Sequence, residues 1–234
     1  MLKICTVYYN GIYSPDYVSK LYNGLKKHST IPFEFICLSD TDVEADLVLP
    51  YNHSSDIKKH WHKLKFFSPD FAYQKPGDDI IVMDIDQTIT NNIDELIGHK
   101  VNDNELITYD SWWDKDLKIN GGFYKFKSGS LKFVWDRFTE NPEYWQMYYY
   151  NQGIVHYKYY GEQNYVYQCM IDHNVKVTLT PGKWLYKETN NFREKLDLEK
   201  LYCKKFNTEF AVMGDVNKYI KVLHNAGVGK KTNG

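Results

Sequence analysis

Short apolar runs alternate with helical repeats along the first part of the chain. Three runs have the length of buried strands: residues 3–9, 32–38 and 45–49. Between the first two, apolar positions recur at helical spacing over residues 15–27, behind Ser14 and Pro15, which favour a helix start. The order strand, helix, strand predicts a βαβ unit, and therefore a parallel sheet with a right-handed crossover.

A second helix and a fourth strand follow this unit. Ile57, Trp61 and Leu64 outline the helix, which Pro69 ends. The uninterrupted apolar run at residues 80–83 predicts a strand buried on both faces. The first 90 residues therefore have the pattern of a Rossmann-type nucleotide-binding half. No Gly-x-Gly-x-x-Gly follows the first strand, which argues against a dinucleotide cofactor.

Two carboxylates stand where the fourth strand is expected to end. Asp84 and Asp86 are separated by one residue, Ile85. Ligand sites in open α/β sheets lie at the carboxyl ends of the strands, and two such carboxylates can both turn toward one hard cation. The alternative is that they only solvate the strand end.

The second half of the chain is less regular. Extended segments are expected at residues 105–109, 122–126 and 176–180. Leu131, Val134 and Phe138 follow helical spacing, and residues 162–171 predict a further helix. Near the end, residues 219–223 lead into His224 and a Gly-rich stretch.

Composition and charge exclude several classes of protein. The chain has 234 residues, enough for a single core, and its 29 basic and 30 acidic side chains nearly cancel, so no nucleic-acid partner is expected. No apolar run approaches the length of a membrane span and no signal-peptide pattern is present, which predicts a cytoplasmic protein. The four cysteines lack metal-ligand spacing, and Cys5 and Cys37 are expected to be reduced, buried thiols.

Six segments, in order, resemble the GT-A-type glycosyltransferases, in particular the glycogenin-like family and its bacterial and viral relatives. They are residues 17–40, Trp61-His62-Lys63-Leu64, residues 92–96, Asn120-Gly121-Gly122, Gly161-Glu162-Gln163 and His224-x-x-Gly227-x-x-Lys230. Glu162 stands where the family has Asp, which leaves its role and the retaining or inverting outcome open. The oligomeric state is also open.

The resemblance implies one α/β domain over residues 1–234. Its mostly parallel, mixed central sheet would be flanked by helices. Residues 1–100 would form the nucleotide-binding half, and residues 101–234 the acceptor half and a terminal metal and pyrophosphate segment.

By the same resemblance, the protein moves a hexose from a nucleotide sugar, expected to be UDP-linked, to a glycan or other hydroxyl acceptor. Asp84, Asp86 and His224 would hold Mn²⁺ or Mg²⁺, and an imidazole beside carboxylates favours Mn²⁺. Gly227 and Lys230 would contact the pyrophosphate.

The remaining expected site residues surround the donor. The resemblance places Val7, Tyr9, Asn10 and Tyr13 around the base and ribose, Lys63 near the phosphates or sugar, and Asn120 and Gly121 beside the sugar. Ile85, between the two carboxylates, is also expected to bind the donor. Glu162 and Gln163 would lie near the anomeric carbon and, with Asp86, form the catalytic set. For Lys63 the alternative is an exposed helix lysine, and for His224 a surface histidine.

A haloacid-dehalogenase-like phosphatase is the alternative function. Asp84-x-Asp86-x-Thr88 after an apolar strand matches the nucleophile motif of that family, with Asp84 as nucleophile, and Met213-Gly214-Asp215 resembles its last acidic motif. The second Asp expected after Asp215 is missing, and a βαβ unit precedes the supposed nucleophile strand. A non-catalytic sugar- or nucleotide-binding module is a third possibility, against which the intact Asp84, Asp86, His224 and Lys230 speak.

The chain has 21 tyrosines, and they are most densely spaced between Tyr144 and Tyr167. With Trp145 and the Trp112-Trp113 pair, they could form a stacking platform for an acceptor sugar. Ordinary packing of a Tyr-rich chain is the alternative.

Overall fold

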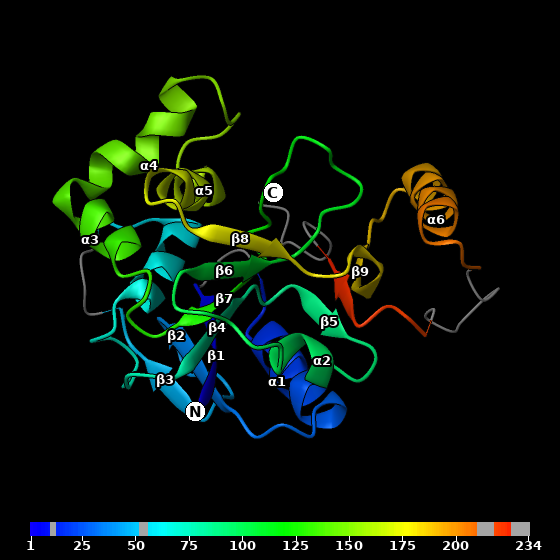
Figure 1. Ribbon diagram of the computed structural model, residues 1–234, viewed down its shortest axis with the longest axis horizontal. Coiled ribbons are helices and arrows are strands. Elements are labelled where there is room, and N and C mark those ends of the chain that lie inside the picture. Colours follow the sequence, from blue (N-terminus) through cyan, green and yellow to red (C-terminus); the bar gives the residue numbers. More distant parts are fainter. Residues whose placement is uncertain (10–12, 52–55, 210–217, 226–234) are drawn as a thin grey trace.

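Seven strands form one mixed sheet in the computed structural model, which describes residues 1–9, 13–51, 56–209 and 218–225 (Figure 1). The strands are β1 (Leu2–Tyr8), β2 (Glu34–Ser39), β3 (Leu47–Leu49), β4 (Asp79–Met83), β6 (Glu105–Thr108), β7 (Phe123–Lys127) and β8 (Lys176–Leu179). Their order is β3-β2-β1-β4-β7-β6-β8. Only β7 runs against its neighbours β4 and β6, so the prediction of a mostly parallel, mixed sheet is confirmed.

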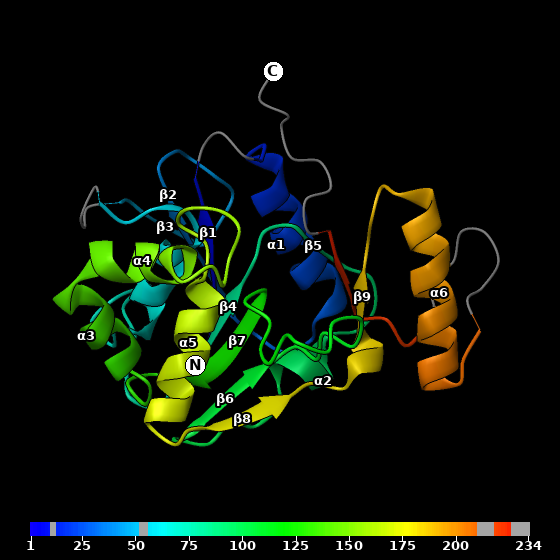
Figure 2. The same ribbon diagram turned by 90° about the horizontal axis from the view of Figure 1, so that it is seen from above.

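Helices cover both faces of this sheet (Figure 2). They are α1 (Asp16–His28), α2 (Asp94–Ile97), α3 (Phe133–Glu140), α4 (Pro142–Asn151) and α5 (Glu162–Asp172), with the 3₁₀ helices η1 (Lys59–Phe67) and η2 (Gly182–Trp184). Helix α1 lies on one face, and α3, α4 and α5 lie on the other. Each face has its own apolar core.

Strand β4 shows why its sequence is an unbroken apolar run. Ile80 and Val82 point into the core under η1 and α5, whereas Ile81 and Met83 point into the core under α1. Successive side chains of a strand alternate between faces, so a strand covered on both sides must be apolar at every position. All four of these side chains are fully buried.

A smaller sheet brings residues 222–224 back to the Asp-x-Asp segment. It contains β5 (Gln87–Ile89), β10 (Val222–His224) and β9 (Leu185–Lys187), in the order β5-β10-β9. In the antiparallel pairing of β5 with β10, Gln87 lies opposite His224. The last described segment is therefore packed against residues 87–89.

Helix α6 (Phe192–Phe206) packs beside this smaller sheet at the edge of the molecule (Figure 1). Its Leu198 and Tyr202 form a third apolar cluster with Trp112 and Tyr186. The Trp112 indole donates to the Leu185 carbonyl at 2.7 Å. Trp112 is thus a core residue at this position and does not contribute to an exposed platform.

Some predicted elements differ in kind or were missed. The helix outlined by Trp61 and Leu64 is a 3₁₀ helix, and most of its nine residues are buried, including Lys63. Burial on several sides leaves no single apolar face, so the helical period could not identify its type. The sequence predicted neither α4 nor α6, nor the three-residue strands β5 and β9.

Two further expectations concern the whole chain. All four cysteines are free, and Cys5 and Cys37 are buried, as predicted. Within the described ranges, no helix is long and apolar enough to cross a membrane.

Candidate active site

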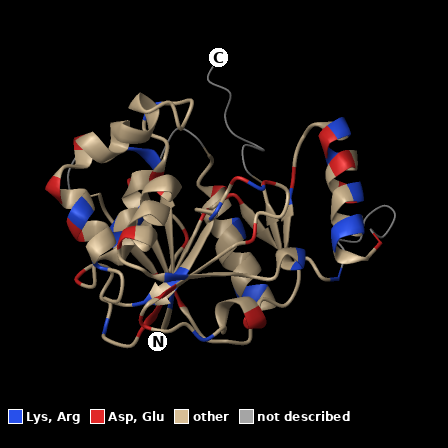
Figure 3. Cartoon of the chain, turned by 45° about the horizontal axis from the view of Figure 1, so that its top comes forward, with Lys and Arg blue, Asp and Glu red and all other residues tan. Residues whose placement is uncertain are grey.

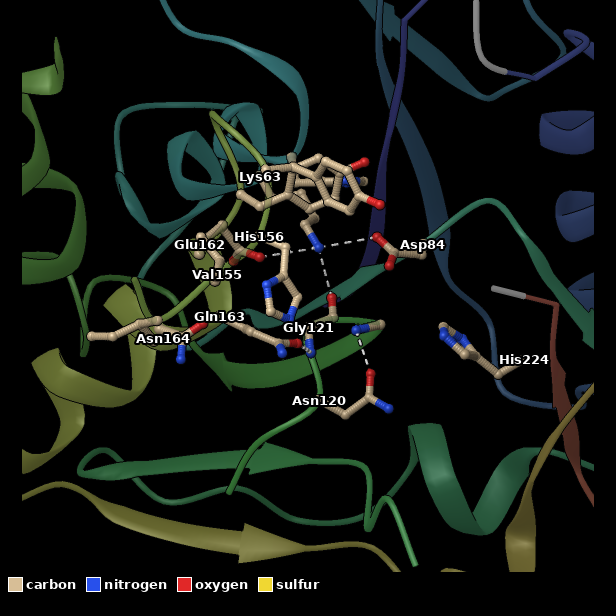
Figure 4. A pocket seen from close by; sticks show the side chains of 16 residues that line it. Lys63, Asp84, Asn120, Gly121, Val155, His156, Glu162, Gln163, Asn164 and His224 are labelled. Atoms are coloured by element: carbon tan, nitrogen blue, oxygen red, sulfur yellow. Dashed lines mark hydrogen bonds and ion pairs between the residues drawn. The ribbon is translucent and has the colours of Figure 1, made fainter. Parts of the chain in front are cut away.

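The main cavity of the site opens at the carboxyl end of β4 and has a volume of about 360 Å³. Its polar lining residues come from several of the predicted motifs: Lys63, Asp84, Asn120, Gly121, Glu162, Gln163 and His224. Figure 4 shows Lys63 between Asp84 and Glu162, with Gly121 below it and His224 across the cavity. Residues that lie far apart in the sequence thus share one space.

A second, smaller cavity of about 50 Å³ lies on the other side of Asp84. It is lined by Val7, Tyr9, Tyr13, His60, Asp84, Ile85 and Asp86. Asp84 and His60 line both cavities, so the two spaces meet at the Asp-x-Asp segment. Asn10, which was expected beside the base and ribose, lies outside the described residues. Gly227 and Lys230, which were expected at the pyrophosphate, lie outside them as well.

Asp86 is not a solvated strand end. Its residue surface is 8 % exposed, and its carboxylate accepts a hydrogen bond from the Tyr13 hydroxyl at 2.8 Å. Burying a carboxylate is unfavourable without partners, so a side chain that only solvated the strand would not be turned inward. The interpretation of Asp86 as a solvating residue is therefore wrong.

Lys63 is a buried cation held by three acceptors. Its ammonium lies 3.1 Å from Asp84 Oδ1 and 3.3 Å from Glu162 Oε2, and it donates to the Gly121 carbonyl at 2.8 Å. Burial alone would lower the pKa of Lys63, but the charges of Asp84 and Glu162 raise it above its ordinary value. Lys63 therefore stays charged, and the alternative of an exposed helix lysine is wrong.

Lys63 also separates two carboxylates with opposite pKa shifts. Burial opposes ionisation of Asp84, but the charges of Lys63, His60 and His224 hold its pKa below the usual range. Burial raises the pKa of Glu162; the Lys63 charge opposes this effect, and the charge of Asp84 adds to it. Two titratable groups with divergent pKa values in one cavity are a common property of active sites.

The backbone of Gly161 places Glu162 at the first position of α5. Gly161 has φ of +106°, and a Cβ there would lie 2.8 Å from the Tyr149 side chain, so only glycine fits. Glu162 is 5 % exposed, and within the described part of the chain its Oε1 has no hydrogen-bond partner. One carboxylate oxygen is therefore held by Lys63, and the other has no hydrogen-bond partner among the described residues.

The loop of residues 120–122, here called the 120–122 loop, forms the floor of the cavity. The Gly121 amide donates to Gln163 Oε1 at 3.2 Å, and the Gly122 amide donates to Asn120 Oδ1 at 2.8 Å. A Cβ on Gly121 would lie 3.1 Å from Glu162 Oε2, and one on Gly122 would lie 3.1 Å from His224 Cε1. The absence of side chains lets both glycines approach the surrounding polar groups closely.

His224 is turned inward as well. It is 9 % exposed, and no described residue forms a hydrogen bond with its Nδ1 atom. A surface histidine, the alternative for this residue, does not fit this burial. A buried imidazole nitrogen without a polar partner, on the same cavity as the Asp84 carboxylate, fits a metal ligand.

The metal-binding set itself stays a prediction. In the ranges that the structure describes, no three His, Cys, Asp or Glu side chains form a group that could hold a metal ion. The carboxylates are engaged elsewhere, Asp84 with Lys63 and Asp86 with Tyr13. The donor types suit Mn²⁺ or Mg²⁺, but a shared ion would need Asp84, Asp86 and His224 to come closer together.

One wall of the cavity was predicted only in part, through tyrosines that belong to the expected platform. The segment of residues 154–160, here called the 154–160 wall, contributes Ile154, Val155, His156, Tyr157 and Tyr160, and it ends at Gly161. Ring contacts lead from Tyr157 to Tyr160, from Tyr160 to His60 and from His60 to Tyr9. The crowding of aromatic residues before Gly161 was the available signal. It could not indicate which of the rings face the cavity.

The predicted tyrosine platform separates into two groups. Tyr149 and Tyr165 are buried in the core, and Tyr165 packs against Trp61 and Phe138. Tyr157 lines the cavity and is 68 % exposed. Ordinary packing therefore explains Tyr149 and Tyr165, whereas Tyr157 lies on the cavity.

The fold is shared with known glycosyltransferases, although no family model and no curated protein matches the chain. The structure is similar to the glycosyltransferase GlyE of Streptococcus pneumoniae TIGR4 (TM-score 0.59, 11 % identity), covering 95 % of this chain and 53 % of GlyE. It is also similar to the galactosyltransferase LgtC, solved with donor and acceptor sugar analogues (TM-score 0.57, 14 % identity), covering 97 % of this chain and 88 % of LgtC. The chain thus spans about half the length of GlyE.

These similarities show that the chain has the GT-A fold, as the six sequence segments predicted. Assignment to the glycogenin-like family within this fold remains a prediction.

Proposed function

We propose that this protein is a metal-dependent glycosyltransferase that moves a hexose from a UDP-sugar to a hydroxyl acceptor. The observation that carries the proposal is the meeting of Lys63, Asp84, Glu162, His224 and the 120–122 loop on one cavity. Motifs predicted separately, in a chain with the GT-A fold, converge on the edge of the sheet where such folds bind ligands. The choice of UDP rests on the sequence resemblance.

The reaction requires groups that stabilise a departing diphosphate. Transfer breaks the bond between the anomeric carbon and a diphosphate oxygen, so negative charge grows on the diphosphate while the sugar approaches an oxocarbenium ion. Asp84, Asp86 and His224 would hold a divalent cation, which when bound offsets the charge on the diphosphate. Lys63 is charged, buried and in place beside Gly121, so it supplies a fixed positive charge in the same cavity.

The two cavities would divide the donor between them. Val7 and Tyr9 line the smaller one, where the Tyr9 ring lies 6.2 Å from that of His60 and provides an aromatic face for a base. The sugar would enter the larger cavity, between Asn120, Gly121 and Glu162. The Glu162 carboxylate, held by Lys63, can accept hydrogen bonds from sugar hydroxyls or take a proton from an acceptor.

The 154–160 wall is the proposed acceptor side. Ile154 is 53 % exposed and Tyr157 is 68 % exposed, although both line the cavity. Aromatic and aliphatic groups pack on the apolar faces of sugar rings, while hydroxyl and imidazole groups bind the ring hydroxyls. A glycan acceptor fits this mixture better than a charged one.

The phosphatase alternative finds less support. Its nucleophile would be Asp84, whose Oδ1 is paired with the buried Lys63 ammonium. Its last acidic motif, Met213-Gly214-Asp215, lies outside the described residues. The βαβ unit before β4 belongs to a fold shared with glycosyltransferases.

A screen of nucleotide sugars for release of free nucleoside diphosphate, with Mn²⁺ or Mg²⁺, tests the proposal. One UDP-sugar should be turned over, and Asp86→Asn should lower that turnover by about 100-fold or more, because it removes a charge placed to hold the cation. Asn keeps an acceptor for Tyr13. Asp103→Ala, at an exposed position, is the matched control and should retain activity.

Two results would overturn the proposal. One is the absence of turnover for every nucleotide sugar tested with either metal. The other is metal-dependent release of phosphate from simple phosphomonoesters that is lost in Asp84→Asn, which would establish the phosphatase.

A further inference from the structure

Gln87, directly after the Asp-x-Asp segment, is a buried polar residue that the proposed chemistry does not use. It begins β5 and is 2 % exposed. Its side chain forms two hydrogen bonds inside the protein. Buried amides with both ends bonded fix the position of their neighbours, because breaking either bond leaves a polar group unsatisfied.

The first bond reaches the 120–122 loop. Gln87 Nε2 donates to the Gly122 carbonyl at 2.5 Å, and the Asp84 amide donates to the same oxygen at 3.1 Å. A carbonyl oxygen has two lone pairs, so the two donors can occupy both of them. Asp84 and Gln87, which flank Ile85-Asp86, therefore both hold the Gly122 carbonyl of the 120–122 loop.

The second bond anchors Gln87 itself. The Tyr109 hydroxyl donates to Gln87 Oε1 at 2.9 Å, and Tyr109 is 1 % exposed and follows β6. The Gly122 carbonyl can only accept, so the NH₂ group of Gln87 faces Gly122 and its Oε1 atom is left to accept from Tyr109. The result is a chain of hydrogen bonds from Tyr109 through Gln87 to the Gly122 carbonyl.

Gln87 also lies beside His224. The two residues are opposite each other in the pairing of β5 with β10. A Cβ on Gly122 would lie 2.9 Å from Gln87 Nε2 and 3.1 Å from His224 Cε1, so both side chains pack on the same glycine. The Asn225 amide donates to the Asp86 carbonyl at 2.8 Å, which joins the same strands one residue further on.

We infer that Gln87 is a positioning residue. It sets the distance between the 120–122 loop, the Asp-x-Asp segment and His224 through the hydrogen-bond chain from Tyr109 to Gly122. Its role in donor turnover rests on the proposed function, whereas its hold on the loop is a property of the ligand-free protein. Gln87 contacts the groups that would hold the donor and has no direct role in the reaction.

The test compares Gln87→Leu with Gln146→Leu. Gln146 is a matched control, because it is 1 % exposed, has three hydrogen bonds and lies on α4 outside both cavities. Both variants lose a buried amide of the same size, so both should lower the melting temperature. Only Gln87→Leu should shift the Gly121 and Gly122 amide resonances in the ligand-free protein.

Donor turnover separates positioning from packing. At a temperature where both variants are folded, Gln87→Leu should lower kcat/KM for the donor by about 10- to 100-fold, as the loss of a supporting contact does at other sites. Gln146→Leu should stay within about 3-fold of the unmodified protein. Tyr109→Phe removes only the anchoring hydroxyl and should cause a smaller loss in the same direction, which keeps the test open if Gln87→Leu does not fold.

Unchanged Gly121 and Gly122 resonances in Gln87→Leu and Tyr109→Phe would overturn the inference. Equal losses of kcat/KM in Gln87→Leu and Gln146→Leu would overturn it as well, since packing alone would then explain both. If the unmodified protein turns over no donor, the proposed function fails, and the resonances still decide whether Gln87 positions the loop.

Discussion

At the scale of single residues, Lys63 is the electrostatic centre of the candidate site. It is 3 % exposed and its charge lies between those of Asp84 and Glu162. Removing one member of a buried charge group leaves the others without compensation, and this is strongly destabilising. The sequence could place Lys63 in a helix ahead of β4 but could not predict its contact with Glu162, because that contact depends on how α5 packs.

Lys63→Met should therefore destabilise the protein in a pH-dependent way. The folded-state pKa of Glu162 is raised above its ordinary 4.5, so protonation of this carboxyl favours the folded state. The stability of the protein therefore falls as the pH rises through the raised, folded-state pKa. Loss of the Lys63 charge raises this pKa further. The expected loss at pH 8 is about 3–5 kcal/mol of unfolding free energy, and it should be smaller at pH 5.

Urea unfolding at the two pH values measures this effect. The double substitution Lys63→Met and Glu162→Gln is the control, because it removes the carboxyl that the charge compensates, and it should recover part of the loss at pH 8. An equal loss at both pH values would show that Glu162 does not titrate as its surroundings indicate.

Burial of His224 and Asp86 could not be predicted from the sequence. Both residues have ionisable side chains of types that are usually exposed or only partly buried. They are buried because β5 and β10 pair and carry them inward. That pairing joins segments far apart in the chain through two three-residue strands, which are too short to show a period.

At the scale of elements, the long strands and amphipathic helices were predictable and the short elements were not. Strands β1, β2 and β4 are rich in apolar residues and buried at almost every position, because both faces of the sheet are covered. Helix α1 has one buried face, formed by Val18, Leu21 and Leu25. Helix α6 was not predicted, because only Leu198 and Tyr202 of its fifteen residues are buried and other apolar residues, such as Leu196, are exposed, so no clear apolar period is present.

The pairing of β6 with β8 depends on a buried acid, Glu105. The ammonium of Lys176 on β8 donates to Glu105 at 2.8 Å, and Thr178 also donates to it. Burial alone would raise the pKa of Glu105, but hydrogen bonds from Lys176, Thr178 and Asn102 lower it to about 2, from an ordinary value of 4.5. The ionised form therefore stabilises this edge of the sheet.

Glu105→Gln should abolish part of the acid sensitivity of the protein. Because the folded-state pKa is lowered, the contribution of Glu105 is complete above pH 4.5 and is lost as the pH falls toward about 2. Between pH 6 and pH 3 the change in unfolding free energy should be about 2 kcal/mol smaller in the variant, because about 1.5 of these pH units lie below 4.5 and each contributes about 1.4 kcal/mol. Unfolding at pH 6 and pH 3 measures it, with Glu140→Gln at an exposed position as the control. An identical pH dependence in Glu105→Gln and the unmodified protein would contradict the assignment.

At the scale of the whole molecule, charge is distributed without a dominant sign. Basic and acidic side chains alternate along α6, the helix at the right of Figure 3, and both signs occur around the sheet. Among the described residues that line the cavity, Lys63, Asp84 and Glu162 form one group of ion pairs. The proposed function depends on this local arrangement.

Motif order was the part of the site that the sequence revealed best. The succession of the motifs along the chain matched one fold, and the structure brings residues of four of the six segments to one cavity, among them Lys63, Gly121, Glu162 and His224. The 154–160 wall and Gln87 could not be found in this way, since their importance comes from contacts made only after folding.

In the proposed function, Asp84, Asp86 and His224 hold a metal ion together with a nucleoside diphosphate. UDP and Mn²⁺ should then bind with strong mutual dependence, because each supplies ligands or charge that the other needs, and the coupling is reciprocal. At about 100 times its dissociation constant a ligand stabilises a protein by roughly 2.7 kcal/mol, which corresponds to a rise in melting temperature of about 5–10 °C for a chain of this size.

Melting curves with UDP, with Mn²⁺ and with both ligands test this claim most directly. The rise with both should clearly exceed the sum of the separate rises. In His224→Ala that excess should largely disappear, whatever the melting temperature of the ligand-free variant, and His99→Ala, at an exposed position, should retain it. An undiminished excess in His224→Ala would exclude His224 from the site, and additive rises in the unmodified protein would contradict a shared metal and diphosphate site.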